Sequence, residues 1–274
     1  MPKENVPVFV GFRTGSESRK DEMGCVMRII ISPAKKMNVD TDSLPPKALP
    51  RLLPKTERLL EALRAMEPQA LQRLWKCNDS IAGLNRERLR SMDLRQGLTP
   101  ALLSYEGIQY RYMAPGVMNA RQLAYLQEHL RILSGFYGLL RPFDGVTPYR
   151  LEMQARLAVD GAKDLYDFWG GLLAEELAEP GGWVLNLASK EYSRAVTPYL
   201  PTGSVLTCVF GEWKDGKVLE KGTLCKMARG QMVRWLAENA VEAREAIPEF
   251  ADLDYRFDRE LSTENQYIFI KGGR

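Results

Sequence analysis

Short runs of apolar residues alternate with helical patterns along this chain, and that alternation limits the folds open to it more than any other feature. The runs at residues 27–32, 130–135 and 183–187 are rich in Ile, Leu and Val, and each has Pro or Gly next to one end. Such short runs are typical of buried strands. Strands that alternate with helices favour an α/β fold built around a sheet.

A β-hairpin is expected near the C-terminal end of the chain. Residues 205–213 and 218–224 flank the sequence KDGK, and an Asp-Gly pair between apolar runs indicates a tight hairpin turn. Because a hairpin places antiparallel strands in the sheet, we expect a mixed sheet rather than an all-parallel one. A final strand is predicted at residues 267–270. The sequence therefore predicts a mixed α/β fold with helices around a mixed sheet.

The helices are predicted from apolar residues at helical spacing and from capping residues. They are expected at residues 55–66, from Pro68, at 79–82 and 85–92 on either side of Gly83, from Asn119 to His129, from Asp164 to about 179, from Ser189, and at 225–239. The tract from 136 to 153 reads as a long loop.

The 274 residues contain 45% hydrophobic and 27% charged residues, which is ordinary for a globular protein. No internal repeat or linker is visible, so we expect one domain over residues 27–274 and a flexible N-terminal extension over residues 1–26. No apolar stretch has the length of a membrane span, and the first residues do not resemble a secretory signal. We therefore expect a cytoplasmic protein. A net charge of +3 is too small to require a nucleic-acid partner.

Cysteine and histidine usage argues against a metal site. Cys25, Cys77, Cys208 and Cys225 are far apart without a CxxC pair, and His129 is the single histidine. A zinc site or a disulfide framework needs closer spacing. The chain also carries no GxSxG, HExxH or P-loop motif. We expect no metal and no cofactor.

The segment around Gly83 has the pattern of a helix-hairpin-helix. In such a motif an apolar-Gly-apolar turn joins two short helices, and the amides at the start of the second helix bind a DNA phosphate. Asn85 tolerates the left-handed conformation of the turn. Arg86 and Arg88 would then contact the DNA backbone without reading its sequence. The alternative is an ordinary helical segment with arginines on a solvated face.

Two groups of cations are candidates for binding an anion. Lys35 and Lys36 follow the first strand, at the end of a sheet where ligands gather in α/β proteins. Lys226, Arg229 and Arg234 lie in the predicted helix from residue 225. Cations near a helix N-terminus oppose the helix dipole, and a bound anion would relieve this. Exposed side chains without a ligand remain the alternative for both groups.

A set of polar residues suggests a different function, an enzyme that acts on a nucleotide or another phosphorylated small molecule. Such residues are expensive to place in a cleft unless they bind something there. A purely structural network is a third possibility. The residues are Tyr149, Arg150, Glu152, Asn186, Ser189 and Glu191.

Taken together, these segments resemble the YaaA family of bacterial peroxide-stress proteins. The matching stretches run in order over about residues 27–271. They are IISPAKKM at 30–37, IAGLN at 81–85, HLRILSGFYGLLRPFDGVTPYRLEM at 129–153, KDLYDFWG at 163–170, VLNLASKEY at 184–192 and KMARGQMVRW at 226–235.

The resemblance implies a single mixed α/β domain with a basic cleft and an embedded helix-hairpin-helix. It further implies binding of duplex or branched DNA without sequence preference, and protection of DNA against damage that depends on hydrogen peroxide and iron. It transfers no catalytic residue. Carried onto this sequence, the DNA-binding residues are Gly83, Asn85, Arg86, Arg88, Lys35, Lys36, Lys226, Arg229 and Arg234. We therefore expect a DNA-binding stress protein, with the enzyme as the alternative.

Overall fold

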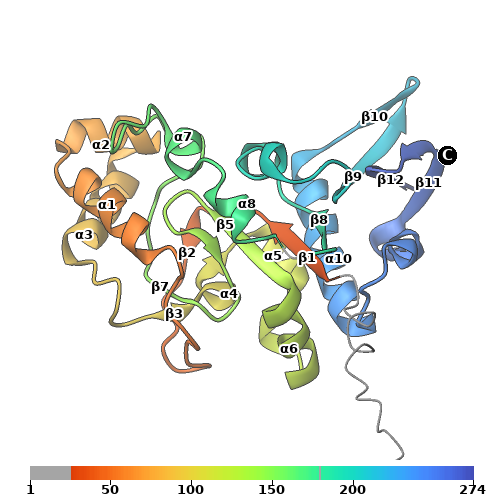
Figure 1. Ribbon diagram of the computed structural model, residues 1–274, viewed down its shortest axis with the longest axis horizontal. Coiled ribbons are helices and arrows are strands. Elements are labelled where there is room, and N and C mark those ends of the chain that lie inside the picture. The colour runs from red at the N-terminus through yellow and green to blue at the C-terminus, as the bar shows by residue number, and fades with distance from the viewer. Residues whose placement is uncertain (1–25, 179) are drawn as a thin grey trace, which may run out of the picture.

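The computed structural model describes residues 26–178 and 180–274 (Figure 1). The extension predicted over residues 1–26 lies outside these residues except for Val26. The described chain forms one mixed α/β domain, as predicted.

The core of the domain is an eight-stranded mixed sheet in the described part of the chain. Across the sheet the strands lie in the order β11 (Tyr255–Thr263), β12 (Gln266–Lys271), β9 (Val205–Lys214), β8 (Trp183–Asn186), β1 (Met27–Ile31), β5 (Leu130–Ser134) and β6 (Gly138–Leu140), with β10 (Lys217–Leu219) paired to β9. Strands β12, β9, β8, β1 and β5 are parallel, whereas β6, β10 and β11 join antiparallel. The predicted hairpin is β9–β10.

Two strands of the eight-stranded sheet were not predicted. β6 lies within the tract expected to be a loop, and β11 has the sequence YRFDRELST. Most residues of β11 are polar because it is an edge strand that leaves one side to solvent, and it pairs only with β12 in the sheet order. Such a strand has no apolar run from which to recognise it.

The central strand β1 determines where the functional site lies. Ile29 pairs with Leu130 of β5 on one side and with Leu185 of β8 on the other, and all of β1 except Arg28 is fully buried. The chain goes from β1 to β5 and only later returns to β8. In open α/β sheets, ligands bind outside the carboxyl ends of the strands at such a change of direction.

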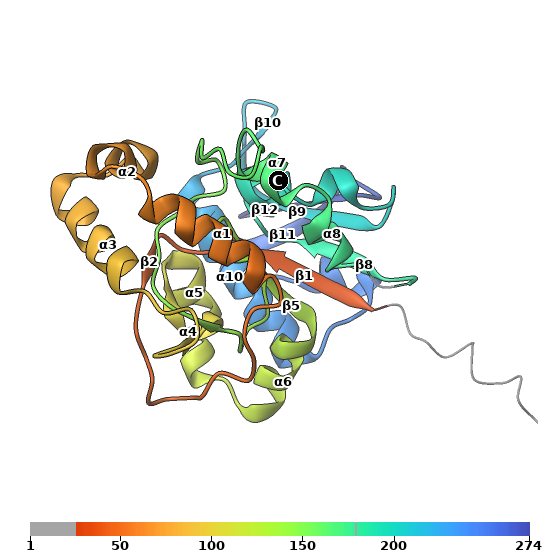
Figure 2. The same cartoon turned by 60° about the vertical axis from the view of Figure 1, so that its left-hand side comes forward.

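The helices surround the sheet (Figures 1 and 2). They are α1 (Leu53–Arg64), α2 (Pro68–Trp75), α3 (Asp79–Ser91), α4 (Ala101–Ser104), α5 (Ile108–Met113), α6 (Ala120–His129), α7 (Leu165–Trp169), α8 (Leu172–Glu175), α9 (Lys190–Ser193) and α10 (Gly222–Asn239). Helices α1, α2 and α3 form a group, here called the helical group, at one end of the molecule, and β10, β11 and β12 lie at the other end (Figure 1). Asn119 caps α6 with a capping box, as the sequence predicts.

The prediction of a helix-hairpin-helix at residues 82–85 is wrong, because α3 is one continuous helix through Gly83. The helix begins before this glycine, where the Asn78 side chain accepts a hydrogen bond from the Ile81 amide at 3.0 Å. Asn85 does not form a turn. Its side chain is 6% exposed and donates to the Ile81 carbonyl at 2.8 Å, as a residue inside a helix can.

The predicted helix from Asp164 to about 179 is also interrupted. Asp164 does cap α7, but Gly170 takes a positive φ of 49° and separates α7 from α8. Glycine accepts this left-handed value of φ at little cost, so the chain turns there instead of continuing as a helix.

Candidate functional site

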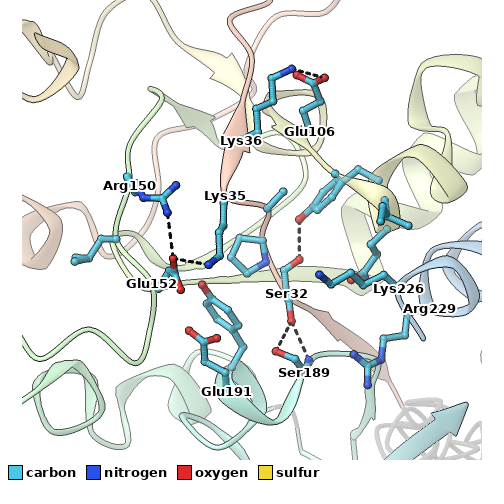
Figure 3. A pocket seen from close by; sticks show the side chains of 18 of the residues that line it. Ser32, Lys35, Lys36, Glu106, Arg150, Glu152, Ser189, Glu191, Lys226 and Arg229 are labelled. Carbon is cyan, nitrogen blue, oxygen red and sulfur yellow. Dashed lines mark hydrogen bonds and ion pairs between the residues drawn. The ribbon is translucent and has the colours of Figure 1, made fainter. Parts of the chain in front are cut away.

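A cavity of about 420 Å³ lies at the carboxyl ends of β1 and β8 (Figure 3). Its walls come from the segment after β1, the loop at 149–152, α9, α10 and the start of α5. The charged residues that line it are Lys35, Lys36, Glu106, Arg150, Glu152, Glu191, Lys226 and Arg229. With every group charged, five cations face three carboxylates.

Two serines join the chain segments that follow β1 and β8. The Ser189 amide donates to the Ser32 hydroxyl at 2.8 Å, and the two hydroxyls are 3.2 Å apart. The Tyr110 hydroxyl of α5 donates to the Ser32 carbonyl at 3.0 Å. Three segments that are distant in sequence therefore meet at Ser32, in the centre of the cavity wall (Figure 3).

The carboxylate of Glu152 is held by two cations on one side of the cavity. Lys35 lies 2.9 Å from it and Arg150 lies 3.6 Å from it. The Arg150 guanidinium also donates to the Trp75 carbonyl at the end of α2, at 3.3 and 3.4 Å. Arg150 is 12% exposed, whereas Lys35 is 65% exposed. Arg150 therefore forms part of the wall, and Lys35 lies at the rim.

Burial raises the pKa of Glu191, and the nearby negative charge of Glu152 raises it further. A hydrogen bond from the Gln154 amide and the charge of Lys35 oppose this rise. Desolvation is the largest of these effects because it penalises the charged carboxylate. Glu191 therefore retains its proton to a higher pH than an ordinary glutamate does, whereas the carboxylate of Glu152 is held by two cations.

The opposite side of the cavity is cationic and contains donors without partners. Lys226 is exposed and has no hydrogen bond or ion pair with the described residues. Arg229 is 13% exposed and lies 3.8 Å from Glu220, a long ion pair. Its Nε is buried without a partner in the described chain, and so is the Nε2 of Gln109, a residue that is 7% exposed. Buried donors are rarely left unsatisfied in proteins.

A close helix contact brings these donors together. Any side chain at position 230 of α10 would collide with the Gln109 carbonyl of α5, so only glycine allows the two helices to approach so closely. A short pair of strands, β2 (Lys36–Met37) and β4 (Tyr105–Glu106), fixes the start of α5 next to the segment after β1. Helix α5 thus forms one wall of the cavity.

A hydrogen-bonded group of buried hydroxyls lies behind the cavity wall at Tyr149. The Tyr149 hydroxyl lies 2.8 Å from the Tyr105 hydroxyl and 2.6 Å from the Ser134 hydroxyl. Burial raises the pKa of both tyrosines, so they are neutral. Because its hydroxyl has two partners, Tyr149 is held firmly in the wall.

The structure gathers nine of the predicted site residues around the cavity. They are Lys35, Lys36, Tyr149, Arg150, Glu152, Ser189, Glu191, Lys226 and Arg229.

The other predicted residues lie elsewhere. Asn186 is buried, where its side chain contacts Thr207 and accepts from the Ala188 amide. Arg234 pairs with Glu238 one helical turn further along α10, 2.7 Å away.

The residues Gly83, Asn85, Arg86 and Arg88 belong to the helical group and do not line the cavity. Arg88 is half-buried, and desolvation lowers the pKa of its guanidinium. Arg86 is exposed.

Sequence reasoning missed the contribution of α5, namely Gln109 and Tyr110, and the central role of Ser32. The sequence of α5, IQYRYM, matches no binding motif. One signal was available, since Gly230 inside a long helix indicates close approach of another segment.

Two further properties concern residues 26–178 and 180–274. In these ranges no helix is long and apolar enough to cross a membrane. Within the same ranges, no three His, Cys, Asp or Glu side chains gather as a metal ion would require.

Comparison with known proteins identifies the family. A family model described as peroxide stress protein YaaA matches residues 27–261. The chain is 51% identical over 247 residues to a UPF0246 protein of Lachnoclostridium phytofermentans, which covers 90% of this chain and 97% of that protein. It is 50% identical over 246 residues to a UPF0246 protein of Pediococcus pentosaceus, with 89% and 98% covered. The chain belongs to the peroxide stress protein YaaA family.

Proposed function

We propose that this chain is a cytoplasmic DNA-binding protein of the peroxide stress response, and that it binds DNA without sequence preference through phosphate contacts at the rim of the cavity. The observation that carries the proposal is that five cations line one cavity at the carboxyl ends of the central strands β1 and β8. Three of them, Lys35, Lys36 and Lys226, are exposed, and Lys226 comes from a different segment than the other two. Bound DNA would be shielded there from damage that depends on peroxide and iron.

The physical basis is the charge of the DNA backbone. Each phosphate that a lysine or arginine neutralises releases counterions, so affinity falls steeply as salt rises. Such contacts position the DNA but carry no base information. The rim of the cavity suits this role because Lys226 is free to move onto a phosphate without breaking an ion pair among the described residues.

Helix α3 contributes less in this proposal than a helix-hairpin-helix would. Arg90 of α3 is already paired with Glu87 at 2.8 Å, and Arg88 is half-buried. Arg86 is the exposed cation that remains for a phosphate from the predicted set on this helix.

The test is a fluorescence-anisotropy titration of random-sequence and branched duplexes at low and physiological salt. The wild type should bind with strong salt dependence, and the Lys35→Met, Lys226→Met double variant should reduce the slope of log affinity against log salt by about 2, or about 1 for each lost contact. The Arg86→Met, Arg88→Met variant should change this slope by less than about 1. Lys217→Met, on the distant hairpin strand β10, is the control. No binding by the wild type at low salt would reject the proposal.

A second function is favoured by one specific observation. The cavity has the volume of a small-molecule site, and one of its lining residues, Gln109, has a buried Nε2 without a partner in the described chain. A duplex is too wide to enter a cavity of this volume. We therefore keep an enzyme that acts on a nucleotide or another phosphorylated small molecule as the alternative. Glu152→Gln should abolish such an activity and leave salt-dependent duplex binding in place.

A further inference from the structure

The cavity has two chemically different sides. Figure 3 shows Lys226 and Arg229 on one side of Ser32, and Glu152 and Glu191 on the other. A ligand that fills the cavity therefore meets Lys226 and Arg229 at one end, and at the other end two carboxylates, of which Glu152 is already paired with Lys35 and Arg150. This polarity restricts the ligand much further than the total charge does.

The cationic end fits a phosphate group. The Nε2 of Gln109 and the Nε of Arg229 are buried and have no partner in the described chain. Both residues line the cavity, so an anion bound there would lie beside donors that the described chain leaves without an acceptor. Lys226 adds an exposed charge at the same end. Guanidinium, amide and ammonium donors together are a usual set for a phosphate.

The carboxylate end fits a planar ring with N–H donors. Glu191 and Glu152 are hydrogen-bond acceptors when charged. The walls beside them include the rings of Tyr149 and Tyr192 and the side chain of Leu151, so apolar surface lies next to the carboxylates. Aromatic and aliphatic walls bury the faces of a ring, while carboxylates select a ring edge that donates.

We propose that the cavity binds one nucleotide, with its phosphate at the Gln109–Lys226–Arg229 end and its base at the Glu152–Glu191 end, and that it prefers a base with neighbouring N–H donors, as guanine has. The inference rests on the proposed contact with phosphate and adds the chemistry of the rest of the ligand. A cavity of about 420 Å³ is within the range of sites that enclose such a molecule.

The same nucleotide chemistry has two sources, a free mononucleotide or one unit of a single strand. A free molecule enters the cavity as a whole. A strand would place one unit in the cavity and its neighbouring phosphates on Lys35 and Lys36 at the rim. The affinity of a short single strand relative to a mononucleotide separates these sources.

The experiment is isothermal titration calorimetry of the full chain with dGMP, dTMP, deoxyguanosine, inorganic phosphate and a single-stranded oligonucleotide that contains one guanine. We expect dGMP to bind at least about tenfold more tightly than dTMP, deoxyguanosine or phosphate, because each of those lacks one of the recognised groups. Tighter binding of the oligonucleotide would support a strand as the source, and tighter binding of dGMP would support a free nucleotide.

Variants assign the two ends. Lys226→Met should weaken dGMP binding by about tenfold and leave the preference for dGMP over dTMP unchanged. Glu191→Gln should remove that preference, and Gln109→Met should weaken phosphate and dGMP in parallel. Lys226 is exposed, so its variant tests the site even if the buried ones fail to fold. Lys217→Met is the control and should bind as the wild type does.

The results also distinguish this inference from the proposed function. Binding of dGMP no tighter than that of inorganic phosphate would overturn the inference and leave the phosphate contact in place. Salt-dependent duplex binding without any binding of dGMP would overturn the inference and keep the DNA proposal. Tight dGMP binding without duplex binding would support the inference and reject the DNA proposal.

Discussion

The helical group and the cavity are both rich in cations, yet the fold treats these cations differently. In α3, Arg90 pairs with Glu87, and the space beside Gly83 is open. In the cavity, Lys226 is unpaired within the described chain, and the buried donors of Gln109 and Arg229 have no hydrogen-bond partner there. A similar density of charge in the sequence thus produces a solvated helix in one place and the lining of a cavity in the other.

The difference shows which property of a charged segment indicates a ligand. Charge that can be neutralised locally, as between residues three apart on one helix, needs nothing else. In the cavity, charged residues from separate segments meet at the carboxyl ends of the strands, and buried donors are left unsatisfied. Such donors cost folding free energy unless a ligand accepts hydrogen bonds from them. Matched substitutions in the two regions test this difference.

The largest contrast is expected between two glycines. Gly230→Ala should lower the free energy of unfolding by about 3 kcal/mol, because the new methyl group collides with the Gln109 backbone. Gly83→Ala should raise it by about 0.5–1 kcal/mol, since the site is open and the residue is inside a helix. Urea denaturation measures both. A destabilised Gly83→Ala variant would show that residue 83 is a turn and not part of a continuous helix.

The second contrast is between two serines. Ser32→Ala should lower the free energy of unfolding by about 1–2 kcal/mol, because the Ser189 amide loses its acceptor. Ser91→Ala in α3 removes an exposed hydroxyl that donates to the Glu87 carbonyl, so its effect should stay within about 0.5 kcal/mol. Equal losses in thermal or urea unfolding would mean that Ser32 does not join the strand ends.

A smaller effect, which depends on pH, is expected at Glu191. Its raised pKa means that the folded state holds this proton more tightly than the unfolded chain does, so the stabilisation is complete below about pH 4.5, the ordinary value for Glu, and is lost as pH rises through the raised pKa. Glu191→Gln should therefore gain stability relative to the wild type between pH 4.5 and 7. Glu87→Gln, an exposed carboxylate in α3, should show no such gain in denaturation curves at these pH values.

The smallest effect is expected at Arg86. Arg86→Met should change the free energy of unfolding by less than about 0.5 kcal/mol, because the side chain is exposed on α3. Lys226→Met should be equally stable and yet reduce the salt slope of duplex binding by about 1. If the two variants exchange these behaviours in anisotropy titrations, the DNA contact belongs to the helical group.

Sequence patterns were sufficient for the parts of the fold that depend on local residues. The strands β1, β5 and β8 were predicted from buried apolar runs, and α6 was predicted from its cap at Asn119. The same patterns failed at Gly83, where a glycine was compatible with both a hairpin turn and a continuous helix. Nothing in a local window decides between these conformations, since the surrounding chain selects one.

The candidate site was predictable where its residues follow strands. Lys35 and Glu191 lie shortly after β1 and β8, and parallel strands bring the segments at their carboxyl ends together. Gln109 was not predictable, because its place in the wall depends on how closely α5 approaches α10. That distance is determined by packing between helices distant in the sequence.

Arg150 connects the two regions, because its guanidinium binds the last carbonyl of α2 and faces Glu152 in the cavity. A ligand that neutralised Glu152 would alter the charge that faces Arg150, and the hydrogen bonds from Arg150 to α2 would respond. We therefore expect amide hydrogen exchange around Trp75 to differ between the empty and the occupied cavity, and local opening of α2 would change the affinity for the ligand to the same degree.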